Sequence, residues 1–150
     1  IRRSIMATSF SVSLVSWHDG EPLLRSVREA VFIREQGIPP ELEWDGLDEN
    51  CRHALVLSSN GEAIGCGRMQ ADGHIGRIAV LPKWRKQKVG TAIMEALLDY
   101  ARAHDYRQVY VDAQTYAVPF YRSFEFVEEG EVFPDAGMPH IRMRLKLLPR

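Results

Sequence analysis

The segment Arg77-Ile-Ala-Val-Leu-Pro-Lys-Trp-Arg-Lys-Gln-Lys-Val-Gly-Thr91 decides the fold, because it runs from an apolar strand through a basic turn into the most regular helix pattern of the chain. The start of a helix presents backbone N–H groups without partners and the positive end of the helix dipole, so it stabilises anions. Gly90 would let a ligand approach the backbone closely. The turn adds four positive charges, at Lys83, Arg85, Lys86 and Lys88. These features predict a site for a ligand that carries several phosphates.

Charge spacing alone leaves an alternative of equal weight, a solvated basic loop in front of an amphipathic helix. A dinucleotide-binding fold is less favoured, because the segment has no G-x-G-x-x-G and the strands before it form a meander rather than a βαβ unit. A P-loop is excluded by the missing Gly-Lys-Ser/Thr. Nucleic-acid binding is also disfavoured, since Trp84 is the one aromatic residue in the basic stretch 83–88.

The patterns on either side of this segment predict a mixed α/β fold. Apolar alternation bounded by turn residues predicts strands at 10–14, 54–57, 63–69, 75–81, 108–113, 126–132 and 140–147. Apolar stripes at helical spacing predict helices at about 23–35, 89–104 and 118–124. The strands between 54 and 81 follow one another without room for crossover helices, so they should form an antiparallel meander. We therefore expect a mixed, mostly antiparallel sheet of six to seven strands, flanked by helices.

The composition is that of one globular domain over residues 1–150, with 45% hydrophobic and 26% charged residues and a net charge of −1. Neither a membrane nor a nucleic acid is expected as a partner, because the apolar runs are short and the overall charge is near zero. Cys51 and Cys66 stand outside any metal-ligand pattern, so we expect no metal and two buried thiols in a reducing cytoplasm. Residues 1–5 lack the apolar stretch of a secretory signal, and we interpret Met6 as the natural start after a cloning remnant.

The segment 77–91 resembles the acyl-CoA motif of the GNAT acetyltransferase family, in which a Val-x-Pro-like turn runs into Arg/Gln-x-x-Gly-x-Gly/Ala and a helix. Val80, Pro82, Arg85, Lys88 and Gly90 stand at the matching positions. The stretches 31–45, 114–121 and 137–140 are similar to the ElaA-like branch of that family. The resemblance implies a GNAT acyl-CoA N-acyltransferase fold, with acetyl-CoA as the cosubstrate.

The same resemblance implies that backbone amides of residues 86–91 hold the CoA pyrophosphate, and that a bulged strand at 78–80 pairs with the pantetheine arm. The expected cofactor-binding residues are Ile78, Ala79, Val80, Arg85, Lys86, Gln87, Lys88, Val89, Gly90, Thr91, Gln114 and Tyr121. Lys88 departs from the family pattern, because it replaces the first glycine. A helical φ at this position would accommodate the lysine.

Acetyl transfer to an amine needs a base for the acceptor ammonium, a donor for the carbonyl oxygen, and an acid for the departing thiolate. Glu35 and Glu43 are our first candidates for the base, ahead of Asp45, Asp48, His53 and His140. The alternative for the acids is that 41–50, which is rich in carboxylates, is a solvated loop or short helical turn. The alternative for the two histidines, His53 and His140, is a purely structural role. The backbone N–H of Val80 suits the carbonyl oxygen, and Tyr121 matches the family position of the acid, with aromatic packing as its alternative.

The sequence thus predicts an N-acetyltransferase that transfers the acetyl group of acetyl-CoA to a primary amine of a small molecule or protein, by direct attack in a ternary complex. The competing hypothesis is a domain of the same fold that binds acyl-CoA without useful transfer, which the lysine at position 88 favours. The carboxylates of 41–50 would suit a cationic acceptor, whose identity the sequence does not reveal. Edge strands near the C-terminus would allow a homodimer.

Overall fold

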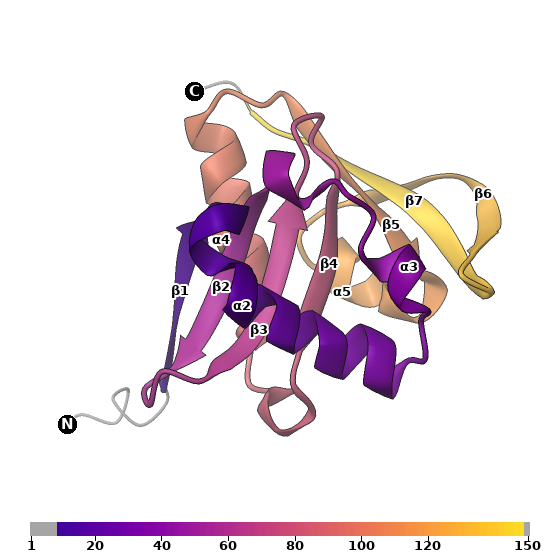
Figure 1. Ribbon diagram of the computed structural model, residues 1–150. Coiled ribbons are helices and arrows are strands. Elements are labelled where there is room, and N and C mark those ends of the chain that lie inside the picture. The colour runs from indigo at the N-terminus through magenta and orange to yellow at the C-terminus, as the bar shows by residue number, and fades with distance from the viewer. Residues whose placement is uncertain (1–8, 149–150) are drawn as a thin grey trace.

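The computed structural model describes residues 9–148, which form two antiparallel sheets that diverge from a shared edge (Figure 1). The first sheet has the order β1-β2-β3-β4 and consists of β1 (Phe10–Val15), β2 (Arg52–Ser58), β3 (Ala63–Met69) and β4 (Ile75–Val80). The second has the order β5-β7-β6 and consists of β5 (Gln108–Gln114), β6 (Val127–Asp135) and β7 (Met138–Lys146). The predicted meander and the mixed, mostly antiparallel architecture are confirmed.

The two sheets meet at the start of β4 and β5. A single parallel bridge joins His74 to Tyr110, and the Tyr110 N–H donates to the Gly73 carbonyl over 3.0 Å. Within residues 9–148 no ladder continues between the two strands after this bridge. β4 and β5 therefore separate towards their C-terminal ends, and a cavity opens between them.

Two long helices cover opposite faces of the first sheet (Figure 1). α2 (Trp17–Arg28) continues as the π-helical η1 (Glu29–Glu35) and packs on Leu55, while α4 (Val89–Ala103) packs on Ala54 and Val56. Successive side chains of a strand point to opposite faces, so β2 contributes to both cores. The remaining helical turns are α3 (Pro40–Glu43), η2 (Asp48–Asn50), η3 (Pro82–Trp84), η4 (Thr115–Ala117) and α5 (Val118–Arg122). Within residues 9–148, no helix combines the length and apolarity needed to cross a membrane.

The first helix begins at Trp17 rather than near residue 23, so the prediction placed its start too late. The Ser16 side chain accepts a hydrogen bond from the Asp19 N–H over 3.1 Å and caps this earlier start. Gly20 and Pro22 lie inside the helix. A Cβ at Gly20 would come within 2.8 Å of Val15, so the glycine serves close packing against β1 rather than a turn. The prediction that residues 1–5 are a remnant falls outside the described residues.

The prediction that residues 41–50 are too charged for the interior is wrong for two carboxylates. Glu43 is 2% exposed and Asp48 is 6% exposed, and both accept hydrogen bonds from the guanidinium of Arg28, which is 1% exposed. The Arg28 Nε lies 2.7 Å from Glu43 and its Nη1 lies 2.6 Å from Asp48. Pairing with a buried cation offsets the desolvation that otherwise keeps carboxylates at the surface.

The ion pairs extend to two arginines of the first sheet. Arg68 on β3 binds Asp48 at 2.8 Å and Asp45 at 2.5 Å, and Arg77 on β4 binds Glu43 at 3.0 Å and Asp45 at 3.3 Å. Burial raises the pKa of Asp45, but the hydrogen bond from Arg68 and the nearby charges outweigh it and lower the pKa to about 2. We call the six side chains the arginine–carboxylate cluster; they are Arg28, Arg68, Arg77, Glu43, Asp45 and Asp48. Its three positive and three negative charges fasten residues 40–50 to β3 and β4.

We expect Arg28→Met to lower the free energy of unfolding by about 3–5 kcal/mol, because it leaves buried carboxylates with one cation fewer. Urea unfolding measures the change. Arg25→Met is the matched control. Arg25 lies on the same helix and stacks on the same Trp44 ring, but pairs with the exposed Glu21, so its loss should cost about 1 kcal/mol or less. Equal effects of the two substitutions would show that the cluster adds nothing beyond stacking.

Candidate active site

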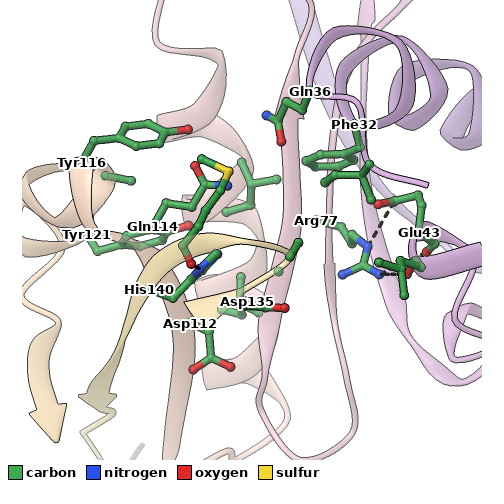
Figure 2. Close-up of a pocket in the computed structure, with 18 of the residues that line it drawn as sticks. Phe32, Gln36, Glu43, Arg77, Asp112, Gln114, Tyr116, Tyr121, Asp135 and His140 are labelled. Carbon is green, nitrogen blue, oxygen red and sulfur yellow. Dashed lines mark hydrogen bonds and ion pairs between the residues drawn. The ribbon is translucent and has the colours of Figure 1, made fainter. Parts of the chain in front are cut away.

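A cavity of about 440 Å³ fills the opening between β4 and β5 (Figure 2). Five of the sequence-predicted site residues line it, namely Glu43, Ile78, Gln114, Tyr121 and His140. The sequence reasoning missed several other lining residues, among them Phe32, Gln36, His74, Arg77, Asp112 and Asp135. Figure 2 shows Gln114, Tyr121 and His140 on one side of the cavity and Arg77 and Glu43 on the other. The cavity thus brings side chains of both sheets together.

The wall formed by β4 carries a bulge. Cys66 on β3 pairs with Ala79 on β4, and Arg68 pairs with Gly76. The two β4 residues Arg77 and Ile78 therefore lie opposite a single β3 residue, the one between Cys66 and Arg68. Arg77 has a φ of +52°, which turns the chain at this point. The bulge was predicted at 78–80 and lies one residue earlier. Its first residue also belongs to the arginine–carboxylate cluster, so the cluster holds the bulge in place.

Beyond the bulge, the backbone of Val80 faces away from β3. The Leu81 N–H donates to the Ile64 carbonyl over 2.9 Å, which makes these two residues a hydrogen-bonded pair. Bonded and non-bonded pairs alternate along an antiparallel ladder, so the neighbouring pair of Gly65 and Val80 is non-bonded. The Val80 carbonyl accepts instead from the Arg85 Nε, at 2.9 Å. The Val80 N–H is therefore directed to the open side of β4, as its predicted role requires.

The basic turn before α4 has two residues with left-handed backbone, Lys86 at φ +64° and Lys88 at φ +69°. A helical φ at Lys88 was the condition for tolerating this residue in place of glycine, and that condition is not met. Left-handed backbone costs a residue with a Cβ roughly 1–2 kcal/mol. No side chain of the described residues caps the start of α4 at Lys88, so its first N–H groups are left for a ligand. The Gln87 side chain donates to the Lys83 carbonyl over 2.9 Å and stabilises the turn.

The other residues predicted to contact CoA around this turn differ in which of their atoms a ligand can reach. Val89 and Ala79 are buried in the two cores, so only their backbones remain available. Gly90 faces the ring of Phe120, where an added Cβ would lie at an ordinary distance of 3.7 Å. The turn itself does not line the cavity, so phosphates bound at the start of α4 would lie apart from the reacting groups.

Two predicted site residues contact each other. The guanidinium of Arg85 donates to both carboxylate oxygens of Glu35, over 2.8 and 2.6 Å. These hydrogen bonds lower the pKa of Glu35, and the residue does not line the cavity. Glu43 does line it, but its Oε2 accepts from both Arg28 and Arg77. Both carboxylates are thus held as ion-pair acceptors, an arrangement that does not favour proton abstraction, and their catalytic role stays a prediction.

The lower-ranked base candidates separate into two groups. Asp45 and Asp48 belong to the arginine–carboxylate cluster, and His53 binds the Asp48 carbonyl through Nε2 at 2.9 Å. Burial lowers the pKa of His53. None of these three lines the cavity, whereas His140 does.

Tyr121 points into the cavity from α5 (Figure 2). Its ring packs edge-on against Phe120 and Phe126, with centroid distances of 5.2 and 5.8 Å. Burial raises the pKa of Tyr121 to about 12, so the phenol keeps its proton at neutral pH. The aromatic packing and the function as an acid are therefore compatible.

Gln114 ends β5 beside Tyr121 and carries a buried side-chain oxygen, Oε1, for which the described residues supply no hydrogen-bond partner. A buried acceptor without a partner is costly, so it indicates a ligand that brings an N–H group. The pantetheine arm of CoA contains amide N–H groups, and so fits this acceptor.

Comparison with known proteins agrees with these features. The sequence model of the Acetyltransferase (GNAT) domain matches residues 30–147. YjcF of Bacillus subtilis, named as an uncharacterised N-acetyltransferase, is 38% identical over 122 residues, which cover 78% of this chain and 86% of YjcF. Protein ElaA of Escherichia coli is 33% identical over 133 residues, covering 83% of this chain and 86% of ElaA.

Solved structures extend the likeness to three dimensions. The crystal structure of Escherichia coli ElaA has a TM-score of 0.79 at 29% identity, over 89% of this chain and 98% of ElaA. An acyl-CoA N-acyltransferase from Pseudomonas aeruginosa also has a TM-score of 0.79, at 27% identity and with the same coverage of 89% and 98%. The two diverging sheets are therefore the GNAT acyl-CoA N-acyltransferase fold, and the chain belongs to the GNAT acetyltransferase family.

Proposed function

We propose that this protein transfers the acetyl group of acetyl-CoA to a primary amine of a small molecule or protein. The observation that carries the proposal is the separation of β4 from β5. It opens a cavity beside backbone groups of β4 that no strand within residues 9–148 pairs with. The uncapped start of α4 lies after the same strand and adds a phosphate site. The long polar arm of acetyl-CoA would fit the unpaired backbone of β4, and its pyrophosphate would fit the start of α4.

Three parts of the chain would hold acetyl-CoA, which supplies an acetyl group activated as a thioester. The backbone N–H groups of residues 86–91 suit the pyrophosphate, helped by the charge of the basic turn. The open side of β4 at Ile78 and Val80 suits the amides of the pantetheine arm. The Oε1 of Gln114 would accept one further N–H.

Two groups in this arrangement suit the chemistry of transfer. The Val80 N–H is free of the ladder and can donate to the carbonyl oxygen as negative charge develops there. The Tyr121 hydroxyl, protonated at neutral pH, can give its proton to the departing sulfur. Because a thiolate is already a tolerable leaving group, Tyr121 should accelerate the reaction without being indispensable.

The acceptor end of the cavity favours a cation. Its charged lining comprises the carboxylates of Glu43, Asp112 and Asp135 and the guanidinium of Arg77. Glu43 is balanced by its arginines and Asp112 by Arg142 at 2.8 Å, but Asp135 has no ion-pair partner among residues 9–148. An ammonium group would be drawn to this side.

Acetyl-CoA or CoA should raise the melting temperature, because a ligand that binds only the folded state stabilises it. Gly90→Val should abolish this shift by placing a branched side chain where the ligand approaches the backbone. Gly90→Ala is the control, since its Cβ would only touch Phe120 at 3.7 Å, and it should keep the shift. Differential scanning fluorimetry with millimolar ligand measures all three proteins. Normal binding by the valine variant would place the phosphate site elsewhere.

Lys88→Gly and Lys88→Ala separate the backbone of Lys88 from its charge. Both remove the charge, so CoA affinity measured by calorimetry should fall and depend less on salt, to the same extent in both variants. Only glycine relieves the left-handed backbone, so Lys88→Gly should be about 1 kcal/mol more stable than Lys88→Ala. Unchanged affinity in both variants would make the lysine a bystander of CoA binding.

Tyr121→Phe should reduce kcat by roughly ten- to a thousandfold while the CoA-induced thermal shift survives, because one hydroxyl is lost and the ring remains. The assay is thiol release from acetyl-CoA with a panel of primary amines. Tyr116→Phe is the control, because Tyr116 also lines the cavity but is 72% exposed, and it should keep the parent rate. A Tyr121→Phe variant with the parent kcat would leave Tyr121 a packing residue. Thermal shifts without thiol release from any amine would favour the competing hypothesis of a binding domain.

A further inference from the structure

His140 has a buried imidazole ring, and one hydrogen bond determines its tautomer. It lies on β7, is 8% exposed, and has Nδ1 2.9 Å from the Met138 carbonyl oxygen. A carbonyl oxygen only accepts hydrogen bonds, so Nδ1 must carry the proton. In the neutral ring the lone pair is then on Nε2.

The surroundings hold this ring in place at the cavity wall. The Phe133 ring on β6 stacks against it with a centroid distance of 6.0 Å and an interplanar angle of 29°. On the other side, His140 pairs across the ladder with Gln114, so the two side chains share one face of the second sheet. No described residue hydrogen-bonds to Nε2, and the Gln114 Oε1 likewise has no partner. A ligand with N–H groups would satisfy both atoms.

The other histidine of the cavity, His74, lacks a free nitrogen. Its Nδ1 lies 3.3 Å from the Gln70 side-chain amide and its Nε2 lies 3.5 Å from Asp112. Its ring also stacks on Tyr110 at 4.5 Å. His74 is therefore committed to the floor where the two sheets join, and His140 alone of the two presents an unoccupied base.

Charged and titratable groups approach His140 from each neighbouring element. On β5 and β7, Asp112 and Arg142 form an ion pair one position along the shared face. Asp135 ends β6, Tyr121 projects from α5, and the Glu43–Arg77 pair lies across the cavity. Since Asp112 and Glu43 are paired with arginines, Asp135 is the unpaired charge of this group among residues 9–148, and it favours a cationic ligand at this wall.

We propose that His140 is the catalytic base, which takes a proton from the acceptor ammonium before attack. The step breaks one N–H bond of the ammonium and forms an Nε2–H bond on His140, so the amine regains its lone pair and the imidazole becomes a cation. Solvent later removes this proton through the open cavity. The assignment depends on the proposed acetyl transfer and adds to it the group that the first two candidates, Glu35 and Glu43, are poorly placed to provide.

The protonation pattern can be measured without any acceptor. Long-range ¹H–¹⁵N correlation spectra of the uniformly labelled protein at pH 8 should show His140 protonated at Nδ1, with His140→Asn used to assign its signals. Free imidazole side chains favour the other tautomer, so the expected result is distinctive. A His140 protonated at Nε2 would overturn the proposal whatever the enzyme does.

Kinetics then tests the base itself with His140→Asn. The asparagine amide can still donate to the Met138 carbonyl, but nothing replaces Nε2. With spermidine, L-lysine and benzylamine as acceptors, we expect kcat/KM to fall by roughly 10²- to 10⁴-fold while the CoA-induced thermal shift is kept. Methoxyamine, a primary amine that is neutral at pH 7.5, should be acetylated by the variant with less than a tenfold loss.

Each contrary outcome is separable from the others. His74→Asn is the control within the same cavity, and its loss should be no larger with spermidine than with methoxyamine. Equal losses with spermidine and methoxyamine, or a variant as active as the parent, would overturn the assignment of His140 while acetyl transfer stands. A parent that releases no thiol with any of the four amines would overturn the proposed function, and the assignment with it.

Discussion

The interruption of hydrogen bonding between β4 and β5 is the constraint from which the rest of the structure follows. The bridge between His74 and Tyr110 brings the two strands together once, and the ladder then stops. Buried backbone N–H and C=O groups without partners raise the free energy of the folded state. An unpaired strand edge beside a cavity therefore indicates a binding partner for those groups. The bulge at Arg77 and the outward-facing backbone of Val80 lie on the strand that borders this opening. The proposed ligand, with its own amides, would complete the sheet that residues 9–148 leave incomplete.

The arginine–carboxylate cluster explains how the opening keeps its shape. Leu42 and Glu43 form part of one wall of the cavity, and the segment 40–50 that contains them has only the two short helical turns α3 and η2. Arg77 links this wall to the bulge, because the residue that turns the strand also binds Glu43 and Asp45. Buried ion pairs contribute little net stability compared with apolar packing, yet breaking one is expensive. The cluster therefore fixes geometry more than it adds stability, which suits the proposed positioning of an acceptor in this cavity.

The sequence allowed the strands, the order of the elements and the start of α4 to be predicted, because those depend on local periodicity. It misled us where distant partners decide. Residues 41–50 were predicted to be a solvated loop or a short helical turn, and the helical turns α3 and η2 are present. Their burial was missed because the arginines that bind their carboxylates lie 15 to 34 positions away in the sequence. An arginine within an apolar strand, as at Arg68 in β3, was the one signal that pointed to buried partners. The late start assigned to the first helix has a different cause, because Gly20 reads as a turn residue and its packing against Val15 is visible only in three dimensions.

In the basic turn, the count of charged side chains and the backbone geometry point to different groups as partners of the proposed pyrophosphate. Arg85 matches the family position, yet its guanidinium is already bound by Glu35 and the Val80 carbonyl, so its charge is largely neutralised within the protein. Lys83, Lys86 and Lys88 remain without ion-pair partners among the described residues, but flexible ammonium groups give little orientation. Directed donors in this region come from the backbone: two left-handed residues and an uncapped helix start expose N–H groups in fixed positions. Recognition of the pyrophosphate would then depend on main-chain geometry, with the lysines supplying attraction at longer range. Directed contacts also hold His140 inside the cavity, where a carbonyl and an aromatic ring fix its side chain rather than a carboxylate.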